Sequence, residues 1–146
     1  MMACGHARPV AVTPQPPPRP RVQLAVIPAE SDVFPRVARA LSASLAGATI
    51  TGVDRTSVSR VSLEVVQLAI ECVDPTEACY QAIGRSMSAN RLLFARIDAA
   101  ARRQLRVTVT LYDVDGKATR RTAEKLFVGE AQAIDGAAAL VAEATR

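Results

Sequence analysis

Two cysteines seven residues apart are the side chains of this sequence best placed for covalent chemistry. Cys72 and Cys79 frame the segment Val-Asp-Pro-Thr-Glu-Ala. On one continuous helix they would be separated by about 10.5 Å along the axis, whereas a disulfide needs Cα atoms within about 7 Å. Asp74 can cap a helix, Pro75 suits the first helical position and Glu77 fits a capping box. We therefore expect a helix to end and another to begin here, which makes a bridge sterically possible.

A disulfide is the interpretation we favour for this pair. It would stabilise the fold by about 2 to 3 kcal/mol in the chain-entropy model and would imply an oxidising compartment. Two alternatives stay open, namely buried reduced thiols and metal ligands. A zinc site needs about four ligands, and the single histidine, His6, lies near the N-terminus. We therefore predict no metal site.

A third cysteine, Cys4, follows Ala3 and precedes Gly5. This pattern is typical of the end of a bacterial lipoprotein signal, where the cysteine is lipidated. Residues 1–20 lack the apolar run of such a signal, so on this interpretation it lies upstream of Met1. The alternative is a free cysteine in an unstructured tail.

Prolines crowd the segment from residue 9 to residue 20. Such a run favours polyproline II, and at about 3.1 Å per residue it would act as a spacer of about 35 Å. A ligand for an SH3-type domain is the competing interpretation. We expect residues 1–20 to be a disordered tether and residues 21–146 to be one folded domain.

The sequence shows none of the residue patterns that would indicate a known type of enzyme. A Ser-His-Asp triad needs a folded histidine, and no Gly-rich phosphate loop has the required lysine and spacing. The segment 113–116, Asp-Val-Asp-Gly, indicates a hairpin turn better than a calcium loop. We predict no catalytic residues and no cofactor, with an enzyme whose site is unreadable from sequence as an alternative.

Arginines cluster along the predicted strands between residues 93 and 128, and the chain as a whole has a net charge of +4 and a pI of about 9.4. As candidate contacts to a partner we single out Arg96, Arg106, Arg120 and Arg121. Nucleic-acid or anionic-polymer binding is the alternative use of these charges. Base stacking needs aromatic side chains on the sheet, and only Phe94 and Tyr112 qualify, so we regard nucleic acid as an unlikely partner.

The elements that position these residues follow from hydrophobic periodicity. Apolar residues recur at helical spacing over 31–45, 62–72, 75–89 and 131–145, and a near-continuous apolar run covers 22–28. Strands are expected at 48–53, 93–98, 105–112 and 117–128, the last more polar and so at a sheet edge. The order β-α-β-α-α-β-β-β-α predicts an α+β domain with helices packed on a mixed sheet.

Residues 22–128 resemble the N-terminal domain of TolB and related domains of CsgG-type envelope lipoproteins. The resemblance rests on Leu-Ala-Val-Ile-Pro at 24–28, Val-Asp-Arg at 53–55, Ile-Gly at 83–84 leading to a strand at 89–96, and Leu-Tyr-Asp-Val-Asp-Gly at 111–116. Many envelope members carry a cysteine pair before the Ile-Gly. The chain departs from them in having no β-propeller and no pore-forming insertion. The resemblance implies a periplasmic interaction module with no catalytic residues to inherit.

Taken together, these patterns predict a non-enzymatic accessory or assembly domain of the periplasm. We expect a lipid at Cys4 to anchor it to the outer membrane, and its partner to be another envelope protein. The strand at 117–128 offers an edge with which a partner strand could pair.

Overall fold

The computed structural model describes residues 13–146, so the predictions for Cys4 and His6 lie outside the described residues. The element order is the predicted one, β-α-β-α-α-β-β-β-α, and the α+β class is confirmed. The elements are β1 (Gln23–Val26), α1 (Pro35–Ala46), β2 (Arg55–Val58), α2 (Leu63–Ala69), α3 (Glu77–Ser86), β3 (Arg91–Ala99), β4 (Gln104–Asp113), β5 (Ala118–Val128) and α4 (Gly129–Thr145).

One mixed sheet of five strands has the order β2-β1-β3-β4-β5. β1 runs parallel to both of its neighbours, while β3, β4 and β5 form an antiparallel meander. The predicted turn at 113–116 joins β4 to β5, and the Gly116 N–H donates to Asp113 Oδ1 at 2.9 Å. β5 lies at a sheet edge, as its polar composition indicates.

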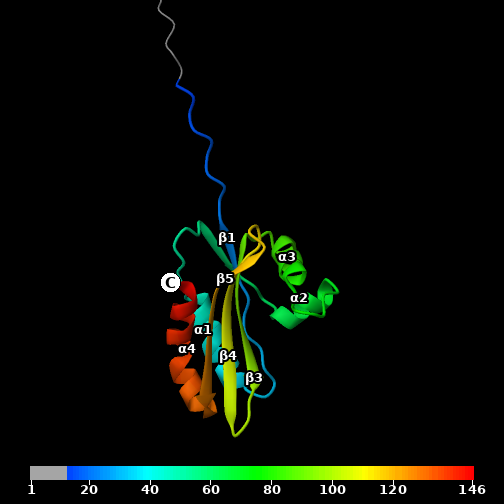
Figure 1. Cartoon of the computed structure of the whole chain (residues 1–146), viewed down its shortest axis with the longest axis vertical. Helices are drawn as coiled ribbons and strands as arrows, with labels where there is room; N and C mark the ends of the chain where they lie inside the picture. Colours follow the sequence, from blue (N-terminus) through cyan, green and yellow to red (C-terminus); the bar gives the residue numbers. More distant parts are fainter. Residues whose placement is uncertain (1–12) are drawn as a thin grey trace, which may run out of the picture.

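Helices cover both faces of the sheet (Figure 1). α1 and α4 enclose one apolar core with the side chains of Leu93 and Val107, and α2 and α3 enclose another with Leu92 and Tyr112. The first half of β3 is consequently buried on both faces. The second core is confined to one end of the sheet, and the far ends of β3, β4 and β5 extend beyond α2 and α3 (Figure 1).

The second strand was predicted at 48–53 and is instead Arg55–Val58. Ala48, Ile50 and Val53 pack against the core from a loop, in which Gly52 has a φ of +82°. All four residues of β2 are exposed because β2 is an outer strand. The apolar pattern therefore marks the partly buried side chains of the loop and not the strand.

Two helix starts differ from the predicted ones. α3 begins at Glu77 and not at Pro75, because the Thr76 hydroxyl accepts the Cys79 N–H at 3.2 Å and so caps the helix in place of Asp74. α1 begins at Pro35, and Ser31 accepts the Phe34 N–H at 3.0 Å in the turn before it.

Candidate interaction surface

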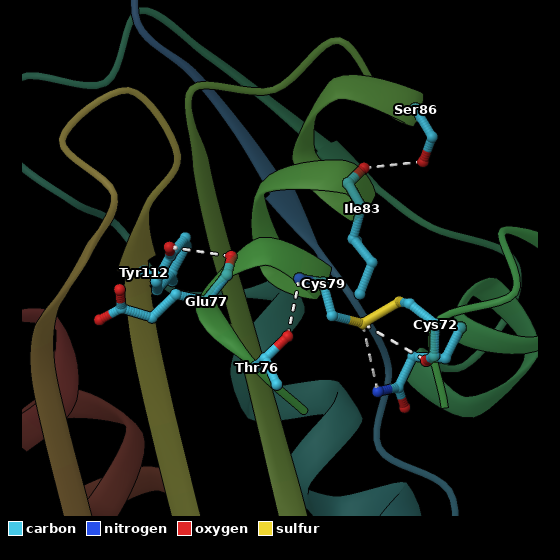
Figure 2. The surroundings of a disulfide bond; sticks show 8 residues. Cys72, Thr76, Glu77, Cys79, Ile83, Ser86 and Tyr112 are labelled. Atoms are coloured by element: carbon cyan, nitrogen blue, oxygen red, sulfur yellow. Dashed lines mark hydrogen bonds between the residues drawn. A yellow bond between two sulfur atoms is a disulfide. The ribbon is translucent and has the colours of Figure 1, made fainter. Parts of the chain in front are cut away.

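The segment from Val61 to Glu77 contains α2 and the loop that leads into α3, and we call it the α2–α3 corner. α2 ends at Ala69, and the loop turns at Glu71, which has a φ of +58°. Cys72 and Cys79 are joined by a disulfide with Cα atoms 5.5 Å apart (Figure 2). The bridge ties the loop to the first turn of α3.

The Cys79 end of this bridge is held firmly by its surroundings. Its side chain is only 3% exposed and belongs to the core beneath α2 and α3. Gln67 of α2 donates from Nε2 to Cys79 Sγ at 3.7 Å. The disulfide therefore fastens a mostly exposed loop to a buried residue.

An aromatic cluster attaches α3 to the sheet next to the corner. The ring of Tyr80 lies 5.0 Å from that of Phe94 and 5.3 Å from that of Tyr112. The Tyr112 hydroxyl donates to the Glu77 carbonyl at 3.3 Å (Figure 2). Burial raises the pKa of Tyr80, and the neighbouring Arg96 guanidinium opposes this shift.

Beyond α3, the same side of the sheet is open. Register places Arg96 opposite Thr108 and Arg106 opposite Leu126, and partners in register point to the same side of a sheet. Arg106 pairs with Glu124 at 3.4 Å, and Thr108 donates to the same carboxylate at 3.2 Å. Arginines and carboxylates alternate on this open face, so it has no concentrated positive charge.

The four arginines predicted to contact a partner do not form one surface. Arg96 and Arg106 lie on the open face, whereas Arg121 is paired in register with Leu111, whose side chain lies in the core beneath α1 and α4. The register shifts beside Leu111, and Arg120 occupies that irregularity with an ion pair to Asp113 at 3.1 Å. Arg121 thus lies on the opposite side of the sheet from Arg96 and Arg106, and Arg120 is held by Asp113 near the turn between β4 and β5.

The prediction from sequence did not identify the exposed apolar side chains of the α2–α3 corner. Leu63 and Val66 face the core as expected, but Val65 and Leu68 of the same helix are exposed. The signal was present, since these two residues fall between the inward positions of the helical pattern.

Two hollows border α2. One, of about 370 Å³, is lined by Pro28, Ala29, Glu30, Arg60, Val61, Ser62 and Val65. The other, of about 110 Å³, is lined by Leu63, Glu64, Gln67, Val73, Pro75 and Arg96. A third hollow, of about 600 Å³, lies between the C-terminal ends of α1 and α4, and its lining is mainly Ala, Thr and Ser.

Within residues 13–146, no group of three or more His, Cys, Asp and Glu side chains is arranged to hold a metal ion. No helix in the same part of the chain is long and apolar enough to cross a membrane.

Comparison with known proteins yields weak structural likenesses. No family model matches the chain, and neither does any curated protein. The C-terminal domain of LpoB from Salmonella enterica is similar with a TM-score of 0.48 at 15% identity, over 73% of this chain and 82% of that one. A dodecameric PelC variant from Paraburkholderia phytofirmans has a TM-score of 0.41 at 14% identity, over 84% of each chain. The resemblance to TolB and CsgG-type domains stays a prediction.

Proposed function

We propose that this chain is a non-enzymatic accessory domain of the bacterial periplasm that binds another envelope protein. On this proposal a lipid on Cys4 anchors it to the outer membrane, and the proline-rich segment separates the domain from the anchor. The observation that carries the proposal is the disulfide between Cys72 and Cys79 at the base of an exposed apolar surface.

The disulfide supports the compartment. Bridges of this kind persist in oxidising compartments and are rare in the reducing cytosol. The bridge serves a structural role because it holds a loop against a buried residue. The α2–α3 corner contains no histidine and no cysteine besides Cys72 that could take part in redox chemistry. A structural bridge is the type found in exported proteins of this size.

Exposed apolar side chains support protein binding. Val61, Val65, Leu68 and Val73 of the α2–α3 corner are exposed, and none of them belongs to either apolar core of the domain. Grouped apolar side chains on the surface of a folded domain mark contact sites for other proteins. The open face favours a protein over a nucleic acid, because Glu124 neutralises Arg106 there.

The entry of the chain into the domain supports the role of the N-terminal segment as a tether. Residues 13–22 run away from the sheet (Figure 1) and form no regular secondary structure. Asp54 accepts the Val22 N–H at 2.8 Å and pairs with Arg19 at 2.9 Å. These contacts fix the point at which the segment joins the domain, and residues 13–18 extend away from that point.

The test is the location and thiol state of the full chain in the cell that makes it. Cells are fractionated, free thiols are alkylated before and after reduction, and the masses are compared. We expect the chain in the envelope fraction, with a lipid on Cys4 and with Cys72 and Cys79 alkylated only after reduction. A Cys72→Ser/Cys79→Ser variant should show no such change in mass. Chain found in the cytosol with three free thiols would refute the proposal.

A further inference from the structure

The exposed apolar side chains of α2 lie along one side of the helix. Val65 is 44% exposed and Leu68 is 72% exposed, and they are three residues apart. Val61 is 42% exposed and lines the same hollow as Val65. Val73, at 79%, continues the surface into the disulfide loop. We call these four residues the apolar stripe.

The stripe belongs to neither core of the domain. α2 buries Leu63 and Val66 in the core, whereas Val65 and Leu68 of the same helix are exposed. The disulfide and the aromatic cluster around Tyr80 hold the corner in place from the inner side. Within the described part of the chain, half of the large hydrophobic side chains that are exposed lie in this one segment. A surface of this kind is best explained by a partner that covers it.

The charges around the stripe indicate what that partner is. Residues 61–84 contain Glu64, Glu71, Asp74 and Glu77 and neither lysine nor arginine, although the chain as a whole is basic. All four carboxylates are exposed, and none of them takes part in an ion pair formed among residues 13–146. Arg60 and Arg96 line the two hollows that border α2.

We propose that the apolar stripe binds a basic, apolar-faced segment of a partner protein. Two or three aliphatic side chains of that segment would cover Leu68 and Val65 and enter the bordering hollows. Its lysines or arginines would meet Glu64, Glu71 and Asp74, and such complementarity speeds encounter and selects the partner. This inference rests on the proposed function and adds the chemistry of the partner to it. On this inference the partner contacts the carboxylates around the apolar stripe, and not the four arginines that were predicted from the sequence to contact it.

The first test measures binding of a synthetic amphipathic helix of leucines and lysines to the full chain at low and high salt. The same peptide with glutamates in place of lysines should bind at least tenfold more weakly. Leu68→Ser should weaken binding about tenfold, as loss of a central apolar contact does. Leu126→Ser is the matched control, since Leu126 is 48% exposed on the open face, and it should leave binding unchanged.

A charge control separates the rim from the net charge of the protein. Glu71→Gln should weaken binding several-fold at low salt and little at high salt. Glu143→Gln removes the same charge from an exposed position of α4 and should have no effect. Equal binding of the two peptides, or equal effects of the two glutamate variants, would refute the inference. Leu68 and Glu71 are exposed, so their variants should keep the thermal unfolding midpoint of the parent chain, which is checked first.

The second test uses the cell that makes the protein. A photo-crosslinking amino acid is placed at Leu68, at Leu126 and on the edge strand at Lys125. A crosslink at Leu68 to a segment rich in lysine, arginine and aliphatic residues supports the inference. Crosslinks only at the other two positions, or a Leu68 crosslink to an acidic segment or to a second copy of the chain, refute it and leave the proposed function standing. Absence of crosslinks at all three positions counts against both.

Discussion

Reduction of the Cys72–Cys79 bridge should destabilise the domain without unfolding it. The bridge closes a loop of eight residues, with a sequence separation of 7. In the chain-entropy model such a loop restricts the unfolded chain by about 8 cal/mol/K, or about 2.5 kcal/mol at 25 °C. Because a loss of 1 kcal/mol lowers the melting temperature of a domain of this size by about 4 °C, the midpoint should fall by about 10 °C.

The bridge is not expected to hold the native structure by itself. Cys79 stays buried beside Gln67 after reduction, and the Tyr112 hydroxyl still reaches the Glu77 carbonyl. The loss should therefore appear as an earlier cooperative transition of unchanged shape and not as loss of secondary structure.

The assay is thermal unfolding followed by circular dichroism, with and without a phosphine reductant, in a Cys4→Ser background that prevents intermolecular bridging. Thiol alkylation and mass measurement establish the redox state of each sample. Cys72→Ala/Cys79→Ala is the control and should unfold at the same midpoint in both conditions. Equal midpoints for the oxidised and reduced parent chain would show that the loop-closure reasoning is wrong.

Three further predictions concern the helix that the bridge joins. Gly84→Ala would place a Cβ against both methyl groups of Val114, one of them at 2.8 Å. Overpacking of about 1 to 3 kcal/mol should outweigh the gain in helix propensity of about 1 kcal/mol, so the free energy of unfolding should fall. Urea unfolding of the double variant with Val114→Ala should show a smaller loss of free energy than the sum of the losses in the two single variants. Thr76→Ala removes the cap of α3 and should lower the unfolding free energy by about 1 kcal/mol, whereas Thr76→Ser should not; equal loss in both would refute the role of the hydroxyl. Burial raises the pKa of Tyr80 in the folded chain above 10.0, so the contribution of Tyr80 to the free energy of unfolding is fully present below pH 10.0 and is lost as the pH rises beyond that value. The free energy of unfolding should therefore fall less steeply with pH in Tyr80→Phe than in the parent chain, and parallel pH curves for the two chains would contradict the assignment.

The sequence by itself determined the order and type of the elements. Alternating apolar residues predict the meander from about residue 93 to 128, and helical spacing identifies the four helices, because these periods depend only on near neighbours in the chain. The interruption at Asp74 and Pro75 is likewise local. It predicts that one helix ends and another begins between Cys72 and Cys79, and the structure has that break.

Only the tertiary structure decided which residues share a surface. β2 is identified by its hydrogen-bonded pairing with β1, because its four residues are all exposed and show no apolar alternation. Arg96 and Arg121 lie on opposite sides of the sheet, because Arg96 is paired in register with Thr108 and Arg121 with Leu111. Leu68 is exposed because no helix or strand of residues 13–146 covers the outer side of α2. Each of these facts depends on contacts between segments distant in sequence, and no local pattern encodes where such segments meet.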